Sequence, residues 1–292
     1  MDMRKVPASA GAEWLLATFR LLKRSPAGFG ALGAIYAGLW LASVLGTTAA
    51  PGAAAPLQAV MMLLGPLLLA GMIFAAHEVD HGGGATPAHL MAAFRTGKAG
   101  RVVTTLIPQV LVLMLCMVLL VAIVGMDNLE KLAALMARLQ TEAQKGGQVD
   151  PKLFMDLPAG RMLVWLLLVI VIGVFSTLLT LTVIPDMLFG DVRLLAAMKR
   201  SFGACLRNPA AVIVFLVLGV VVLFAAAIGL GLAVGTLGLI LGDVAVLVGQ
   251  AITNGFFACF LSGAMYHAWK GLLGPTETAT AIPSPGPTGV AM

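Results

Sequence analysis

The sequence predicts an all-α, polytopic membrane protein with six transmembrane helices. Hydrophobic residues make up 60% of the 292 positions, charged residues only 11%, and the mean hydropathy is +1.01, whereas soluble domains are about half apolar and a quarter charged. A short basic segment also recurs three times, each time before a pair of apolar runs, as Leu15–Arg20, Leu90–Arg95 and Leu194–Lys199. The spans are therefore expected to form three parallel helical-hairpin repeats, each preceded by a cytoplasmic amphipathic interfacial helix.

Six apolar runs are long enough to cross a bilayer. A spanning helix needs about 20 apolar residues, and it satisfies its backbone polar groups within the lipid. Pro51 and Pro56 divide the first charge-free stretch into two spans. The predicted spans cover residues 27-47, 57-77, 102-125, 162-184, 210-234 and 245-268. The membrane domain is expected to cover residues 1-272, and the tail 273-292, rich in Pro, Thr, Gly and Ala, to be a disordered cytoplasmic segment.

The recurring segments have the pattern of helices that lie in a membrane interface. In the first, Leu15, Phe19 and Leu22 fall on one helical face, while charged residues fall on the other. The third segment repeats this arrangement, with Met198 and Phe202 on its apolar face. The second segment is shorter and is followed by glycines. Each segment is expected to lie flat and then turn into the span that follows it.

Basic residues are distributed unevenly between the two sides of the predicted spans. Most of the 18 Lys and Arg lie before the first span, between the second and third, or between the fourth and fifth. By the positive-inside rule, these segments and both termini face the cytoplasm, in a bacterial inner (plasma) membrane. Juxtamembrane cations attract anionic lipid by about 1 kcal/mol each, so anionic headgroups are the expected partners, and nucleic acid is not. The predicted headgroup contacts are Arg20, Lys23, Arg24, Arg95, Lys98, Arg193, Lys199, Arg200 and Arg207.

The loop of residues 127-161 is expected on the opposite, external side, where its basic and acidic residues balance. Within it, residues 128-143 are predicted to form a helix with an apolar seam of Leu129, Leu132, Met136 and Leu139. One hypothesis is that this helix docks a protein partner. The other, which we favour, is that it lies on the bilayer or on the outer surface of the protein itself.

The string His77-Glu78-Val79-Asp80-His81 matches the H-E-x-x-H motif, in which two zinc-binding imidazoles share a helical face with a glutamate base. A membrane zinc metalloprotease that uses His77, His81 and Glu78 is therefore one alternative function. Three glycines follow the motif and would fray its helix, and no downstream helix offers an evident third ligand. We favour interfacial anchoring, because polar residues also end the fourth and sixth spans. No cofactor and no catalytic residue are expected.

Polar residues on the sixth span suggest a second alternative. Asp243, Gln250 and Asn254 fall on one stripe of that helix, and polar residues within a span often mark a substrate path. A passive small-solute carrier or channel would use such a stripe. Because no span carries a charge at its middle, we favour hydrogen bonds between helices as the role of these residues.

Three sets of residues carry a resemblance to a known family. They are Arg24-Ser25-Pro26, Gly65-Pro66-Leu67-Leu68-Leu69-Ala70-Gly71, and Ala196-Ala197-Met198-Lys199-Arg200-Ser201-Phe202 followed by Arg207-Asn208-Pro209. Together they resemble a family of uncharacterised proteobacterial six-helix inner-membrane proteins, similar in pattern to the membrane domain of glycerophosphodiester phosphodiesterases. The resemblance implies six helices and no established activity. The leading hypothesis is a non-enzymatic protein that organises membrane lipid or a partner complex.

Overall fold

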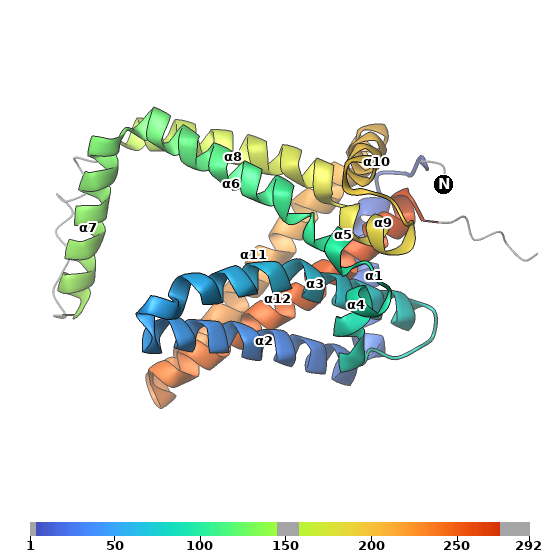
Figure 1. Cartoon of the computed structure of the whole chain (residues 1–292), viewed down its shortest axis with the longest axis horizontal. Helices are drawn as coiled ribbons and strands as arrows, with labels where there is room; N and C mark the ends of the chain where they lie inside the picture. Colours follow the sequence, from blue (N-terminus) through green and yellow to red (C-terminus); the bar gives the residue numbers. More distant parts are fainter. Residues whose placement is uncertain (1–3, 145–157, 275–292) are drawn as a thin grey trace, which may run out of the picture.

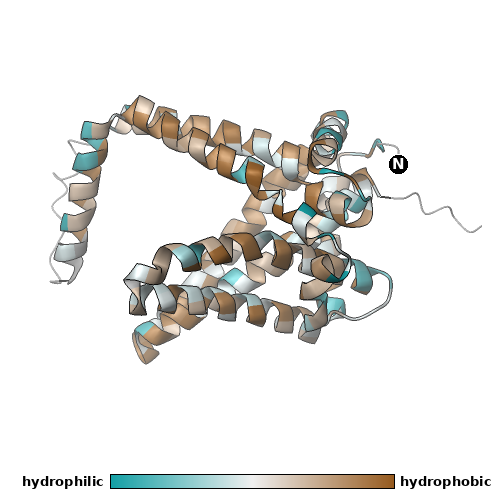
Figure 2. Ribbon diagram, viewed as in Figure 1, coloured by the Kyte–Doolittle hydropathy of each residue, from teal (hydrophilic) through white to brown (hydrophobic). Residues whose placement is uncertain are grey.

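The computed structural model describes residues 4–144 and 158–274, and its regular structure in those ranges is entirely helical (Figure 1). Six segments there are long and apolar enough to cross a membrane, and apolar residues run along each of them (Figure 2). They are α2 (Pro26–Ala49), α3 (Ala54–Asp80), α5 with α6 (Ala99–Val103, Leu106–Val124), α8 with α9 (Ala159–Thr180, Val183–Phe189), α11 (Pro209–Leu241) and α12 (Asp243–Leu272). The chain is a multi-pass membrane protein, as predicted.

The fifth span is longer as a helix than the sequence pattern suggested. α11 continues past residue 234 because the next seven residues carry neither proline nor charge. It stops at Gly242, whose φ of +79° is open to glycine and strained for other residues. The 33 residues of α11 extend about 50 Å, against a hydrocarbon core of about 30 Å. Most of the predicted tail, residues 275–292, lies outside the described residues.

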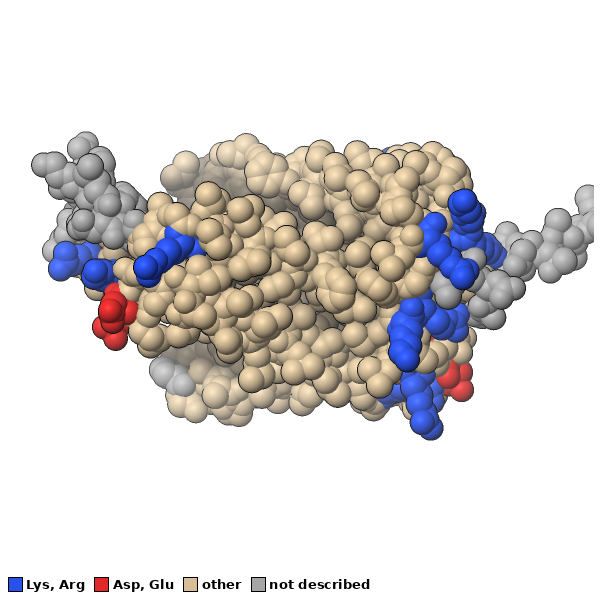
Figure 3. All heavy atoms as spheres, turned by 90° about the horizontal axis from the view of Figure 1, so that it is seen from above, with Lys and Arg blue, Asp and Glu red and all other residues tan. Residues whose placement is uncertain are grey.

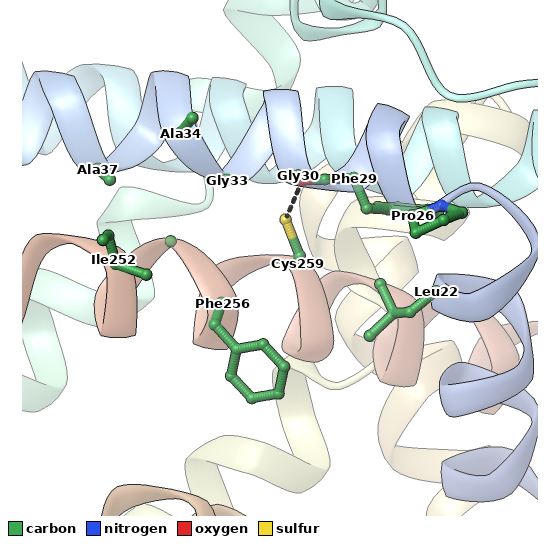
Figure 4. Close-up of a pocket in the computed structure, with 11 residues that line it drawn as sticks. Leu22, Pro26, Phe29, Gly30, Gly33, Ala34, Ala37, Ile252, Phe256 and Cys259 are labelled. Atoms are coloured by element: carbon green, nitrogen blue, oxygen red, sulfur yellow. Dashed lines mark hydrogen bonds between the residues drawn. The ribbon is translucent and has the colours of Figure 1, made fainter. Parts of the chain in front are cut away.

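Four long helices form the main body of the protein. α12 lies at its centre and packs on the other three, α2, α3 and α11. Two glycines meet where it packs on α2. A Cβ built on Gly255 would lie 2.3 Å from the carbonyl oxygen of Gly33, so only glycine fits there. One turn further on, the thiol of Cys259 donates a hydrogen bond to the carbonyl oxygen of Phe29, with an S to O distance of 3.4 Å (Figure 4).

The helices α6 and α8 form a hairpin that diverges from this body (Figure 1). They pack on each other, and the indole Nε1 of Trp165 donates a hydrogen bond of 3.1 Å to the Cys116 carbonyl oxygen. The hairpin joins the body at one end, where α5 and α9 contact α3 and where α10 (Leu194–Arg207) bridges α8, α9 and α11. The rest of the hairpin extends away as a separate arm.

The far end of that hairpin carries α7 (Met126–Gln144), which contains the predicted helix 128–143. Its apolar seam differs from the prediction by one residue. Leu135 is 7% exposed, whereas Met136 is 49% exposed. The predicted seam placed Met136 on the inward face, but in the structure Leu135 is the buried residue. Residues 145–157 of the external loop lie outside the described residues.

Short helices precede the hairpins, and each packs on the hairpin that comes before it in the chain. The helices η2 (Pro87–Met91) and α4 (Ala92–Arg95) pack on α3, and α10 packs on α8 and α9. The first short helix, α1 (Ala10–Arg24), packs on the last hairpin, formed by α11 and α12. The beginning of the described chain thus contacts its last two helices. Trp14, Leu15 and Leu21 of α1 are buried, while Phe19 and Leu22 of the predicted face are only partly buried. This helix belongs to the protein core.

These short helices gather at one end of the molecule (Figure 1), where Lys and Arg side chains also collect (Figure 3). We call this the basic end; it carries Arg20, Lys23, Arg24, Arg95, Lys98, Arg101, Arg193, Lys199, Arg200, Arg207 and Lys270. The opposite end, near α7, shows charges of both signs, and the surface between the two ends is almost free of charge in this view (Figure 3). An uncharged belt of this kind is the surface that a bilayer requires.

Candidate functional site at the basic end

The polar side chains of the membrane domain converge where α3, α9 and α12 end side by side. Asp80 of α3 is the first anchor. Its Oδ2 accepts hydrogen bonds of 2.8 Å from the Tyr266 hydroxyl and of 2.8 Å from Lys270 Nζ, both on α12. A carboxylate bonded to an ammonium and a hydroxyl is well stabilised when it is largely out of water. The ends of the second and sixth spans are therefore joined.

Asp186 of α9 is the second anchor, and its side chain has no exposed surface. Its Oδ1 accepts a hydrogen bond of 3.3 Å from Trp269 Nε1 and lies 3.3 Å from Arg200 Nη2 of α10. The other oxygen, Oδ2, has no hydrogen-bond partner among the described residues. An unpaired buried carboxylate costs several kcal/mol, so Arg200 is required to compensate its charge. We call Asp80, Asp186, Arg200, Tyr266, Trp269 and Lys270 the polar junction.

A break in the fourth span lies beside this junction. α8 ends at Thr180 and α9 begins at Val183, which frees backbone groups inside an apolar region. Ser201 of α10 supplies a partner on each side of the break. Its hydroxyl donates to the Leu178 carbonyl oxygen at 2.9 Å and accepts from the Thr182 amide at 3.4 Å. α10 thus bridges the two parts of the interrupted span.

Asp191 forms a third cluster, on the surface beyond the end of α9. It has a positive φ of 54°, and its carboxylate is bonded to Arg101 of α5, with Lys98 Nζ at 3.8 Å. The hydrogen bond and charge of Arg101, with the charge of Lys98, hold the pKa of Asp191 below its usual value. Lys98 also donates a hydrogen bond of 2.7 Å to the Leu188 carbonyl oxygen. These contacts fix α5 to the end of α9.

A groove of about 590 Å³ lies between α5, α6 and α10 at the basic end. We call it the basic groove; it is lined by Arg101, Thr104, Ile107, Arg193, Leu194, Leu195, Ala196 and Lys199. Three cations and four apolar side chains thus border one hollow. Such a lining suits a molecule with an anionic and an apolar part.

The predicted headgroup cations divide into two groups. Arg20, Lys23, Arg24, Arg95, Arg193, Lys199 and Arg207 are exposed. The other two are engaged within the protein, Lys98 with Leu188 and Asp191, and Arg200 with Asp186. Lys98 and Arg200 therefore already have polar partners within the protein.

The H-E-x-x-H residues lie at the end of α3. The rings of His77 and His81 stack with centroids 4.1 Å apart, and His81 Nδ1 lies 2.7 Å from the His77 carbonyl oxygen. The helix ends at Asp80, and Gly82 has a φ of +87°. Within residues 4–144 and 158–274, no group of three or more His, Cys, Asp or Glu side chains is placed to hold a metal ion. A catalytic zinc takes three protein ligands, and the described residues bring together only this pair, beside Glu78.

Among the described residues, the polar stripe of α12 forms none of the expected hydrogen bonds between helices. Asp243 and Gln250 are exposed, and Asn254 Nδ2 donates a hydrogen bond of 3.0 Å to the Gln250 carbonyl oxygen of the same helix. Thr177 and Thr180 of α8 likewise bond to carbonyl oxygens one turn earlier. The expectation was wrong for Asn254 because the carbonyl one turn back is within reach of a short polar side chain.

An apolar pocket of about 380 Å³ lies between α2 and α12 (Figure 4). Gly30, Gly33 and Gly255 leave it open, and Phe256 points away from α2. It contains no ionisable group apart from the thiol of Cys259, which is bonded to Phe29. This pocket can hold hydrocarbon, but it offers no group for catalysis.

The polar junction was missed at the sequence level. The sequence pattern places Asp80 only within the H-E-x-x-H string, and Asp186 only among the polar residues that end the fourth span. The available signal was that Asp186 is an acid directly after the charge-free run of residues 162–185, where a carboxylate favours a cationic partner. Comparison of the chain with protein-family models, with curated proteins and with solved structures finds no match.

Proposed function

We propose that this chain is a non-enzymatic protein of the bacterial inner membrane whose basic end binds anionic phospholipids of the cytoplasmic leaflet. Both termini lie in the cytoplasm, and the three hairpins are parallel repeats of the six-helix family that the sequence resembles. The role is lipid organisation. The observation that carries this proposal is the basic groove, where three cations border four apolar side chains at the end of the spans.

The charge distribution supports the orientation. Cations collect at the end from which every short helix enters its hairpin (Figure 3), and the positive-inside rule assigns that end to the cytoplasm. Exposed Lys and Arg at this level attract anionic lipid by about 1 kcal/mol each. The exposed cations of α1, α4 and α10 would meet headgroups directly, with Leu16 and Leu195, both exposed, reaching into the lipid beside them.

Cysteine accessibility in intact inner-membrane vesicles tests the orientation. Single cysteines replace Arg20 and Lys199 at the basic end and Arg138 on α7, in a chain without its three native cysteines. We expect a membrane-impermeant maleimide to label Arg20→Cys and Lys199→Cys from the cytoplasmic side and Arg138→Cys only from the other side. Labelling of the first two from opposite sides would exclude the parallel arrangement.

Thermal unfolding in lipid tests the function. The purified protein is compared in nanodiscs of phosphatidylcholine alone and of phosphatidylcholine with phosphatidylglycerol. Ligands that bind the native state raise its stability, so we expect a higher unfolding temperature with phosphatidylglycerol, reduced by high salt. Equal unfolding temperatures in the two lipids would contradict anionic lipid binding.

A further inference from the structure

We propose that one anionic phospholipid binds in the cleft between the α6–α8 hairpin and the rest of the protein, with its phosphodiester in the basic groove and an acyl chain along α6. The inference rests on the proposed function and gives it a specific site. In this proposal, the lipid enters sideways from the bilayer, between the α6–α8 hairpin and the rest of the protein.

The headgroup end is defined by charge. Arg193 and Lys199 are exposed and form no ion pair with any described residue. They are six residues apart on α10 and border the same hollow. Arg101, on the facing wall, is already bonded to Asp191. A phosphodiester carries one negative charge and presents oxygens to the Arg193 guanidinium and the Lys199 ammonium, two cations for which the described residues supply no anion.

The acyl end is defined by a second hollow that adjoins the first. A cleft of about 480 Å³ between α3 and α6 is lined by Ala59, Met62, Leu63, Leu106, Ile107, Val110 and Leu111. Ile107 borders both this cleft and the basic groove. The two hollows therefore follow one another along α6, from cations to a wholly apolar wall.

The combined cleft is long enough for an acyl chain. Ten residues separate Arg101 from Leu111, about 15 Å at the rise of a helix. On the facing wall, Leu63 lies 17 residues before Asp80, the last residue of α3, about 25 Å at the same rise. A lipid with its phosphate at Arg193 would therefore extend its chain beside Leu111 into the hydrocarbon core.

The apolar walls favour a lipid over a soluble phosphate compound. Leu195 is 72% exposed and Ile107 is 56% exposed, directly beside the cations. A small hydrophilic anion would leave these side chains uncovered, whereas a glycerolipid covers them with its own hydrocarbon. The same site thus selects for charge at one end and for a chain at the other.

Native mass spectrometry of the protein released from mixed phosphatidylglycerol and phosphatidylcholine nanodiscs tests the headgroup site. We expect the wild type to retain one phosphatidylglycerol. Arg193→Gln with Lys199→Gln should weaken the affinity for phosphatidylglycerol about 30-fold, because each juxtamembrane cation attracts an anionic lipid about tenfold or slightly less and the two factors multiply. The matched control, Lys131→Gln with Arg138→Gln, removes two exposed cations of α7, outside the groove, and should retain the lipid.

A pair of tryptophan variants tests the acyl cleft. Ile107→Trp would fill the junction of the two hollows, whereas Leu115→Trp places the same bulk on an exposed α6 position outside both. We expect only Ile107→Trp to lose the retained lipid. Equal retention in the two variants would overturn the assignment of the chain to this cleft.

Failure of the basic groove as a lipid site is distinguishable from failure of anionic lipid binding in general. If the groove variant and the α7 control lose phosphatidylglycerol equally, the specific site is wrong and diffuse surface attraction remains. If the wild type does not discriminate phosphatidylglycerol from phosphatidylcholine, the proposed function fails as well. Displacement of the lipid by millimolar glycerol phosphate, which has no acyl chain, would replace the lipid assignment by a soluble phosphate site.

Discussion

The carboxylate of Asp186, which has no exposed surface, lies 3.3 Å from the guanidinium of Arg200. The two residues come from α9 and α10, on either side of the turn that carries Asp191. Their pairing holds the last helix of the interrupted span against the short helix that bridges the break through Ser201. The junction therefore depends on charge compensation as well as on apolar packing.

Removing the two partners of this pair should have unequal effects. Arg200→Gln leaves a carboxylate buried without a cation, which costs about 3 kcal/mol. Asp186→Asn should cost less, because the side chain of Arg200 is 25% exposed and can turn towards water. The unfolding temperatures of both variants and of the double variant in one detergent measure this difference. An Arg200→Gln protein more stable than Asp186→Asn would show that Arg200 does not compensate Asp186.

The membrane architecture was predictable from the sequence because it depends on one-dimensional properties. Charge-free runs have to cross the bilayer as helices, so the positions of α2, α3 and α12 followed from composition and from breaks such as Pro51. Contacts between distant spans have no such local signal. The pairing of Asp80 with Lys270 and the burial of Trp14 on α12 depend on how the hairpins are arranged, and the repeat pattern does not specify that arrangement.

Tyr266 should contribute to the polar junction through its hydroxyl. Tyr266→Phe removes one of the two hydrogen bonds to Asp80 and leaves Lys270 in place. A hydrogen bond to a charged group is worth about 1.5 to 3 kcal/mol, so the variant should unfold at a clearly lower temperature. The other tyrosine, Tyr36, supplies the control, because its hydroxyl has no hydrogen bond within the described residues. If Tyr36→Phe destabilises the protein as much as Tyr266→Phe, the Asp80 bond is not the cause.

The contact between Gly255 and Gly33 should tolerate no added methyl group. Gly255→Ala would place its Cβ 2.3 Å from the Gly33 carbonyl oxygen, a backbone atom that cannot move aside. Separating α2 from α12 to relieve this contact should cost about 1 to 3 kcal/mol. Gly30→Ala, in the same pocket, meets no atom within 4 Å and should keep the wild-type unfolding temperature. Equal behaviour of the two variants would mean that α2 and α12 are further apart than described.

Cys205 on α10 should be nearly inert to alkylation until the protein unfolds. It is 2% exposed, and its burial raises the pKa of the thiol to about 11, against a smaller opposing effect of a hydrogen bond with Ser201. Only the thiolate reacts, so at pH 8 about one molecule in a thousand is in the reactive form. An exposed cysteine with a pKa near 8.5 would be about one quarter thiolate at that pH. The reaction of Cys205 with iodoacetamide should therefore be at least a hundredfold slower than that of an exposed thiol, because burial also hinders access.

The pH range over which the alkylation rate rises distinguishes a raised thiol pKa from simple steric occlusion of the thiol. Because deprotonation is disfavoured in the folded protein, the rate at Cys205 should rise about tenfold per pH unit between pH 8 and pH 10. The rate at Lys199→Cys, an exposed position on the same helix, should level off above about pH 8.5. The measurement uses chains with a single cysteine each, and adding denaturant should equalise the two rates. Fast labelling of native Cys205 at pH 7 would mean that α10 is not packed against α8 and α9, and the bridging of the fourth span by Ser201 would have to be abandoned with it.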